Sequence, residues 1–553
     1  MTPRWLETVV FVLVALVAIK TTDGLRGTFD VGLDDETVYL DGARYLGVHT
    51  LPIAESSPLY PAWYRLLSVF EPDRLRLYFL NWFVLTAALP MALYALARRS
   101  GATLAAAAAI AVAWSLSASA MTWPFVTKFA ALLLAVGAFA ATFPRDRRIG
   151  AAITSVTLSL AAYARAELTM FAYVLAAFVG AWGLVSFARR SKPWHTRWPG
   201  LVAALFATAT AVVLRMHFGD TGTQNRAFFA FAQHYALNLV EDGHLPIDPW
   251  TNWHTLSRPA FPTASTVLEA VKENPRAFLW HITRNLKTLP RTLDELFRPL
   301  RYVPVPLRNI ATLGFDVALA TGAFGLFFAR RRRPGAIRTW LPLLGLVFAS
   351  TIASIVVVYP REHYVLPLCF VGTAALASGT GRIAEALSTI APLRSTMRVG
   401  RALLVVALVL LLAALPSFRM GGAPSLVASA IPPPGAWVQQ NVHTIHTLRE
   451  LHLVGRLVIL ESDYSRGLYA DYDYVRVAQW EKASSFRDFV HARAINVIVL
   501  DDRLRNDPRF ANDPEFRDFV DEREVLDDFV RVPVASTNVV IAVRRALLPA
   551  SAP

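Results

Sequence analysis

Residues 167–190 read ELTMFAYVLAAFVGAWGLVSFARR, an apolar run with charge only at its two ends. A helix needs about 20 residues to cross a bilayer core of roughly 30 Å, and the stretch between Glu167 and Arg189 supplies them. Basic residues favour the cytoplasmic end of a span. The stretch therefore predicts a transmembrane helix over 167–188 whose C-terminal end faces the cytoplasm.

Apolar runs of this kind recur along most of the chain. Of the residues, 54% are hydrophobic and only 17% are charged, whereas a soluble protein has about 25% charged residues. Two of the runs, 149–164 and 363–379, are short and are interrupted by charge near one end. The sequence predicts a polytopic α-helical membrane protein with about eleven transmembrane helices, at 6–23, 77–97, 102–120, 126–143, 149–164, 167–188, 199–216, 309–329, 340–358, 363–379 and 402–418.

The net charge of +14 resides in short basic clusters between the apolar runs. It therefore indicates membrane topology, and no nucleic-acid partner is expected. Eleven helices with a cytoplasmic N-terminus put every cluster on the cytoplasmic side of a cell inner (plasma) membrane. They put the acidic loop 24–76, the long loop 217–308 and the C-terminal tail outside. The clusters are Arg98-Arg99, Arg145 with Arg147-Arg148, Arg189-Arg190 with Lys192, Arg330 to Arg333, and Arg382 to Arg401.

The C-terminal tail has the pattern of a water-soluble domain. The run Ile431-Pro432-Pro433-Pro434 ends the last apolar helix, because proline cannot continue it. Buried strands are expected at 457–461, 495–501 and 538–543, and amphipathic helices at 485–494 and 514–523. We expect a transmembrane module over 1–425 and a small extracytoplasmic α/β domain over 430–553.

The sequence just beyond the first span carries three successive carboxylates, Asp34-Asp35-Glu36. Acids favour the first turn of a helix, so helix capping alone can explain them. Carboxylates close to a bilayer are costly, however, and tend to mark functional sites. Both interpretations stay open from these residues alone.

An acidic pair after the first transmembrane helix, followed by Tyr39 and an Ala-Arg-Tyr helix, resembles the GT-C superfamily. Its members are polyprenyl-phosphate-sugar-dependent glycosyltransferases, such as protein O-mannosyltransferases and lipid A aminoarabinose transferases. The resemblance covers roughly residues 1–420 and implies that Asp35 is the catalytic base, with Asp34 as the alternative and Glu36 beside it. The element Leu59-Tyr60-Pro61 is similar to the one that opens a juxtamembrane helix in these enzymes.

Two further elements resemble the same superfamily. Arg165-Ala166-Glu167 is similar to its Arg-x-Glu element, and the stretch 359–367 is similar to a late Arg-x-x-Tyr-x-x-Pro pattern in which the arginine approaches the lipid phosphate. Each element also has a purely structural explanation. The first can be an Arg/Glu pair that caps two helix ends, and the second an arginine whose side chain extends to the membrane interface. Lys128 stands at a membrane boundary and has the same two interpretations.

These residue types suit sugar transfer from a polyprenyl phosphate. The phosphate leaves without a general acid, so the enzyme needs one carboxylate to take the acceptor proton and cations to stabilise the phosphate. A single displacement of this kind inverts the anomeric carbon. The expected site is Asp35, Asp34 and Glu36 for catalysis, Arg361, Arg165 and Lys128 for the donor phosphate, and Tyr39, Glu167, His363 and Tyr364 for the acceptor or for positioning.

The scheme requires no cofactor, and the sequence contains no compact set of metal ligands. The expected partners are a polyprenyl-phosphate sugar donor, a glycan, lipid or protein acceptor, and membrane lipids. The expected enzyme is a hexosyl- or pentosyltransferase. Two other classes stay open, a transporter or flippase of a lipid-linked sugar and a non-catalytic membrane scaffold. A transporter predicts internal repeats, and none is visible.

The topology can be tested with reporter fusions after residues 100, 190, 335 and 430. The basic clusters predict that the first three report a cytoplasmic location and the fourth an external one. A cytoplasmic signal at residue 430 would rule out the eleven-span arrangement.

Overall fold

The computed structural model describes residues 3–33, 35–46, 58–121, 124–189, 193–218, 223–245, 247–297, 305–328, 337–415, 439–462, 466–477, 485–507, 509–510, 512–523, 526 and 528–549. The chain divides into two compact units. The helical unit comprises Met1–Asp23, Pro52–Tyr60 and Phe83–Ile431. The mixed unit comprises Gly24–Leu51, Pro61–Trp82 and Pro432–Pro553.

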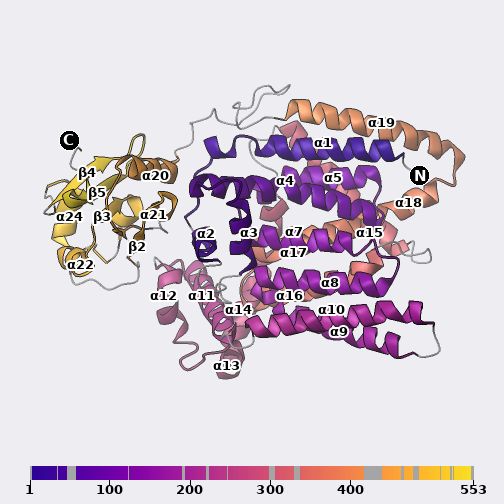
Figure 1. Cartoon of the computed structure of the whole chain (residues 1–553), viewed down its shortest axis with the longest axis horizontal. Coiled ribbons are helices and arrows are strands. Elements are labelled where there is room, and N and C mark those ends of the chain that lie inside the picture. Colours follow the sequence, from indigo (N-terminus) through magenta and orange to yellow (C-terminus); the bar gives the residue numbers. More distant parts are fainter. Residues whose placement is uncertain are drawn as a thin grey trace. The chain divides into compact units, whose positions relative to one another are not determined.

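The chain is mostly helical, and each of the eleven apolar runs overlaps a described helix; the run 102–120 is divided between two. In the helical unit these are α1 (Arg4–Thr22), α4 (Arg74–Ser100), which starts in the mixed unit, α5 (Leu104–Ser115), α6 (Ala118–Met121), α7 (Val126–Ala140), α8 (Arg147–Ala164), η3 (Ala166–Leu168), α9 (Thr169–Ala188), α10 (Trp194–Phe218), α15 (Val305–Phe328), α16 (Ile337–Val357), α17 (Glu362–Ala377), α18 (Thr380–Leu387) and α19 (Ala391–Ala414). The long helices of this unit run side by side in Figure 1.

Seven of the described helical segments are long and apolar enough to cross a membrane: Arg4–Gly27, Arg74–Ser100, Ala166–Ala188, Trp194–Leu214, Val305–Phe327, Arg338–Val357 and His363–Leu387. Three shorter apolar segments are Leu104–Ser115, Val126–Ala140 and Val399–Ala414. The chain is therefore a multi-pass membrane protein. Seven segments of the described chain thus have the length and hydropathy of a span, and the expected count of about eleven spans stays a prediction.

The helices pack closely where their facing residues are small. A Cβ atom added at Gly183 of α9 would lie 2.5 Å from the carbonyl oxygen of Gly200 on α10, and one added at Gly200 would lie 2.7 Å from that of Gly183. Small residues permit this approach, which increases van der Waals contact where no hydrophobic driving force acts between helices. Neighbouring pairs include α7 with α8, α7 with α17, α5 with α15 and α16 with α17.

The expected loop 217–308 is itself helical. It contains α11 (Thr223–Gly243), α12 (Pro249–Ser257), α13 (Val267–Glu273) and α14 (Pro275–Phe297). Helix α14 packs against α16 and α17, and α11 packs against α12, α13 and α14. A small aromatic core joins them, centred on Phe231, which is fully buried against Phe261 and Phe278. This cap of helices holds the end of α16 and the start of α17.

The mixed unit contains a five-stranded sheet in the order β2-β1-β3-β5-β4. Strands β2 (Tyr474–Arg476), β1 (Leu457–Leu460) and β3 (Val497–Leu500) are parallel, and β5 (Val540–Arg544) and β4 (Phe529–Pro533) continue the sheet antiparallel. Around it lie α20 (Gln440–Glu450), α21 (Arg466–Tyr469), α22 (Phe486–Ala492), α23 (Asp502–Arg505), α24 (Pro514–Val520) and η5 (Arg545–Leu547). The strands expected at 457–461, 495–501 and 538–543 are confirmed, as are helices at 485–494 and 514–523; β2 and β4 were not foreseen.

The mixed unit also includes chain from the first loop. It contains η1 (Leu25–Gly27), α2 (Asp35–Tyr45), the greater part of α3 (Leu59–Leu67) and the first turns of α4. The helix expected after the acidic stretch is thus α2, and the Leu59-Tyr60-Pro61 element opens α3. The boundary expected near residue 430 stays a prediction, because the contact-based unit joins these earlier segments to the C-terminal sheet.

Candidate functional site

The two carboxylates of the acidic stretch that the structure describes, Asp35 and Glu36, differ in exposure. Asp35 is the first residue of α2 and is exposed, whereas Glu36 is only 4% exposed. Tyr64 donates its hydroxyl hydrogen to the Glu36 carboxylate, and Asn81 donates to the same oxygen at 3.2 Å. Trp63 Nε1 donates to Asn81 Oδ1 at 2.8 Å and so orients that amide. Glu36 is therefore an anchor of α2, and of these two carboxylates Asp35 is the exposed one.

The other acidic-stretch residues have different positions. Asp34 lies outside the described residues. Tyr39 is buried on α2, and its role towards an acceptor stays a prediction. Asp41 forms an ion pair with Arg44 at 3.1 Å on the same helix.

The turn that carries Arg361 connects the end of α16 to the start of α17. Helix ends leave carbonyl groups without partners, and these are costly near a membrane. The Asn285 side chain of α14 donates to three of them, on Ile355, Val356 and Val358, at 3.0–3.3 Å. Asn285 is fully buried. One amide thus closes the C-terminal end of α16.

His281 completes the same closure. Asn238 Nδ2 donates to His281 Nδ1 at 2.9 Å, which leaves the ring proton on Nε2. His281 Nε2 then donates to the Val357 carbonyl at 3.2 Å. Burial lowers the pKa of His281 to about 4, so the ring stays neutral and keeps this arrangement.

Two more side chains fix the turn itself. Thr292 of α14 donates its hydroxyl hydrogen to the Pro360 carbonyl. Tyr359 donates its hydroxyl hydrogen to the Glu241 carboxylate of α11 at 3.1 Å. Burial and the nearby Glu241 raise the pKa of Tyr359 to about 12, so the phenol remains a donor. The two residues that precede Arg361 are therefore held from two helices of the cap.

The Arg361 side chain is held by an aromatic ring and by no carboxylate. Its guanidinium carbon lies 4.4 Å from the centroid of the Trp250 ring, a favourable cation–π contact. Across the described part of the chain, no carboxylate lies within ion-pair distance of it. Arg361 is also the N-cap residue of α17, whose first turn has no side-chain cap. A guanidinium and a helix N-terminus are two groups that bind anions.

His234 lies among the rings beside this arginine. Its ring packs edge-to-face on Trp250 with 5.4 Å between centroids, and parallel to Tyr359 at 5.7 Å. His234 Nδ1 donates to the Ala230 carbonyl at 2.7 Å, and Nε2 is buried with no hydrogen-bond partner among the residues that the structure describes. Burial, reinforced by the charge of Arg361, lowers the pKa of His234 to about 3. The imidazole is therefore neutral at physiological pH.

The two superfamily-like elements that are almost 200 residues apart in sequence meet in the helical unit. The Arg165 guanidinium carbon lies 5.2 Å from the centroid of the Tyr364 ring, and Arg165 Nε donates to the Glu167 carboxylate at 2.6 Å. His363 packs on Tyr364 at 4.3 Å and on Phe125 at 4.9 Å. Arg165, Glu167, His363 and Tyr364 thus form one cluster, although the charge of Arg165 is shared with Glu167.

Lys128 is in a different setting. It is 1% exposed, and its amine donates to the Ala120 carbonyl at 2.9 Å. The same carbonyl accepts from Thr86 at 3.0 Å. The amine is therefore engaged with protein, and its role towards a phosphate stays a prediction.

Sequence reasoning missed several of the residues around Arg361. His281 and Asn285 stand four residues apart, so they share one face of a helix, and this spacing is a usable signal. The sequence contains no such signal for Trp250 or Glu241, or for the packing of His234 on Trp250. The partners of these residues come from other helices.

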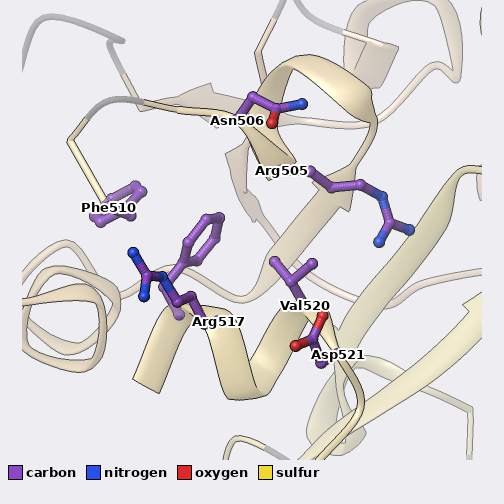
Figure 2. A pocket seen from close by; sticks show the side chains of 7 residues that line it. Arg505, Asn506, Phe510, Arg517, Val520 and Asp521 are labelled. Carbon is purple, nitrogen blue, oxygen red and sulfur yellow. The ribbon is translucent and has the colours of Figure 1, made fainter. Parts of the chain in front are cut away.

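The mixed unit has one further feature, a pocket of about 280 Å³. Figure 2 shows its lining, to which α23, α24 and the turn after α23 contribute: Arg505, Asn506, Phe510, Phe516, Arg517, Val520 and Asp521. None of the expected site residues lines it. The described residues contain no group of three or more His, Cys, Asp or Glu side chains that could hold a metal ion.

No protein-family model matches the chain, and no curated protein matches it. Among solved structures, the archaeal oligosaccharyltransferase AglB from Archaeoglobus fulgidus, in complex with an inhibitory peptide and a dolichol-phosphate, aligns with a TM-score of 0.44 and 12% identity over 91% of this chain and 70% of AglB. The arabinofuranosyltransferase AftD from Mycobacteria aligns with a TM-score of 0.38 and 14% identity, over 98% of this chain and 41% of AftD. At such low TM-scores, neither likeness establishes a shared fold or a shared activity.

The neutral His234 predicts a pH dependence of stability. A buried histidine whose pKa is lowered takes up a proton only on unfolding, so folding stability falls as the pH drops from about 6.5 towards 3. The loss between pH 6.5 and 5 should be on the order of 2 kcal/mol. His234→Phe keeps a ring in place and removes one such group, so it should make this acid limb shallower by about that amount, measured by thermal unfolding in detergent. His281, whose pKa burial lowers to about 4, keeps its own contribution to the limb.

Trp250→Phe is the matched control for that experiment. It trims a ring that packs on His234 but removes no titrating group, so it should shift stability by the same amount at each pH. An acid limb in His234→Phe as steep as that of the wild type would show that His234 does not cause it.

Proposed function

We infer that this chain is a glycosyltransferase that moves a sugar from a polyprenyl-phosphate donor to an acceptor hydroxyl. The observation that carries this proposal is the Arg361 guanidinium, which lies over Trp250 at the N-terminus of α17 with no carboxylate partner among the described residues. An arginine fork binds phosphate oxygens bidentately. Arg361 follows α16 closely, and we propose that its guanidinium reaches the headgroup of a membrane-embedded lipid phosphate.

The proposed reaction is a single displacement at the anomeric carbon. The acceptor oxygen forms a bond to that carbon while the bond from the carbon to the phosphate oxygen breaks, and the phosphate departs with the electron pair. Asp35 takes the acceptor proton as general base. Arg361 stabilises the charge on the departing phosphate, with Arg165 as the second cation. The anomeric configuration inverts.

The exposed position of Asp35 and the buried position of Glu36 support this assignment of roles. Tyr39, Glu167, His363 and Tyr364 are proposed to position the acceptor or the cations. The membrane setting proposed with it is an inner membrane, with a cytoplasmic N-terminus and the reacting groups outside. The acceptor class, whether glycan, lipid or protein, is left open by these residues.

The base can be tested by substitution on α2. Asp35→Asn should lower turnover of a polyprenyl-phosphate sugar by at least about 100-fold, the usual contribution of a general base, while the protein stays folded. Asp41→Asn, a carboxylate lost from the same helix, is the matched control and should retain wild-type turnover. Wild-type activity in both Asp35→Asn and Asp34→Asn would place the base elsewhere.

The phosphate site can be tested by titrating purified protein with a short-chain polyprenyl-phosphate analogue. Arg361→Lys keeps the charge but lacks the fork, so it should weaken binding. Arg361→Ala should weaken it further, by about 10- to 100-fold for a lost charged hydrogen bond. The exposed Arg276→Ala on α14 should bind like the wild type.

Two outcomes of that titration contradict the proposal in different ways. Binding unchanged by both Arg361 substitutions would remove Arg361 from the site. No binding by the wild-type protein would favour a non-catalytic scaffold.

A further inference from the structure

The C-terminal sheet and the acidic helix belong to the same compact unit. The chain around the acidic helix is hydrogen-bonded to two elements of the C-terminal region, the N-terminus of α20 and the helix α21. These contacts reach the chain on both sides of Asp35, which suggests what the C-terminal region does in the proposed reaction.

The segment that leads into α2 caps α20. Gln439, the N-cap residue of α20, makes no side-chain capping bond. The Asp30 carboxylate supplies it instead, accepting from the Asn441 amide at 2.9 Å and from the Val442 amide at 3.0 Å. Gln439 Nε2 donates to the Phe29 carbonyl at 2.6 Å. The chain five residues before Asp35 is therefore hydrogen-bonded to α20.

Asn441 connects this segment to the sheet. Its Nδ2 donates to the Val31 carbonyl at 3.0 Å, and its Oδ1 accepts from Arg466 Nη2 at 2.8 Å and Nε at 3.1 Å. Both ends of the amide are thus used, one towards the segment before α2 and one towards α21.

Arg466 is in turn fixed by the sheet. It is 1% exposed and pairs with Asp501 at 2.8 Å and with Glu461 at 3.2 Å. Glu461 follows β1 and Asp501 follows β3, and these strands are parallel neighbours. The carboxyl end of such a pair is where ligands bind in open α/β sheets. Here the guanidinium of the chain itself occupies that place.

The same short helix α21 contacts the acidic helix directly. The Tyr469 hydroxyl lies 3.4 Å from the hydroxyl of Thr37, two residues after Asp35. Arg74, at the start of α4, donates to the Leu468 carbonyl at 2.9 Å. Three successive interactions of α21, through Arg466, Leu468 and Tyr469, therefore hold the surroundings of Asp35.

We propose that the C-terminal α/β region is a positioning device for Asp35, in which Arg466 and Asn441 hold the segment that leads into α2. The proposal rests on the assignment of Asp35 as the base. Neither residue is proposed to touch substrate; Asn441 acts through the Val31 carbonyl, and Arg466 acts through Asn441.

A double-mutant cycle tests this. Asn441→Ala should lower turnover by about 10- to 100-fold, the loss caused by a displacement of about 1 Å at a reacting group. Binding of the short-chain polyprenyl-phosphate analogue should stay within about twofold of wild type, since that site is in the helical unit. In the Asp35→Asn background, Asn441→Ala should cause no further loss, because the group that it positions is already gone.

Two further variants guard against simple unfolding. Arg466→Lys keeps the buried charge but cannot reach all three partners, and it should behave like Asn441→Ala. Asn506→Ala, an exposed asparagine of the same region, should retain wild-type turnover. The fraction of folded protein is measured for each variant by the near-ultraviolet circular dichroism of purified protein.

The outcomes separate this inference from the proposed function. If Asn441→Ala lowers turnover by the same factor with and without Asp35, or leaves it unchanged, the positioning role is overturned while Asp35 keeps its role. If Asp35→Asn alone has wild-type turnover, the base assignment fails and the positioning role fails with it.

Discussion

The open carbonyl groups at the end of α16 are the constraint on which the Arg361 region depends. Near a membrane these groups cannot rely on water, so side chains must satisfy them. Asn285 and His281 do so from α14, and Thr292 extends the closure to Pro360. Tyr359 and Pro360, which precede Arg361, are hydrogen-bonded to the cap, and the Arg361 guanidinium lies over Trp250.

Hydrogen-bond partners from neighbouring helices also fix the acidic helix α2. Two adjacent carboxylates begin α2. Glu36 is buried and accepts hydrogen bonds, whereas Asp35 is exposed. Glu36 is bonded by Tyr64 and Asn81, so a buried carboxylate is stabilised by the hydrogen bonds it accepts. Asp35, one residue earlier, is exposed. The anchoring residue Glu36 and the proposed base Asp35 are thus adjacent in sequence.

Much of the helical architecture could be predicted from the sequence, because a bilayer imposes a length and an apolar composition on each span. The run 167–188 and its ten counterparts each overlap a described helix, and the continuous apolar runs of β1, β3 and β5 were equally clear. Strands β2 and β4 were missed: β2 has only three residues, and β4 mixes an arginine and a proline into its apolar pattern. Short strands of this kind are defined by the neighbours with which they pair.

The candidate site was predictable only in part. Arg165 and Arg361 were expected at the site because charge interrupts apolar sequence there, and the fold does bring Arg165 to Tyr364; their roles stay predictions. Trp250, Glu241 and Asn441 were not found, since an aromatic residue or an amide in a helix looks ordinary until its partner from another helix is known. The role of Glu36 as an anchor was likewise hidden, because Tyr64 and Asn81 are distant in sequence.

The most direct test of the account is a cryo-electron-microscopy map of the purified protein with a short-chain polyprenyl phosphate bound. The account predicts headgroup density within hydrogen-bonding distance of the Arg361 guanidinium, at the N-terminus of α17. Headgroup density at another place, such as the pocket beside Arg505 and Arg517, with Arg361 still free of any phosphate, would contradict it.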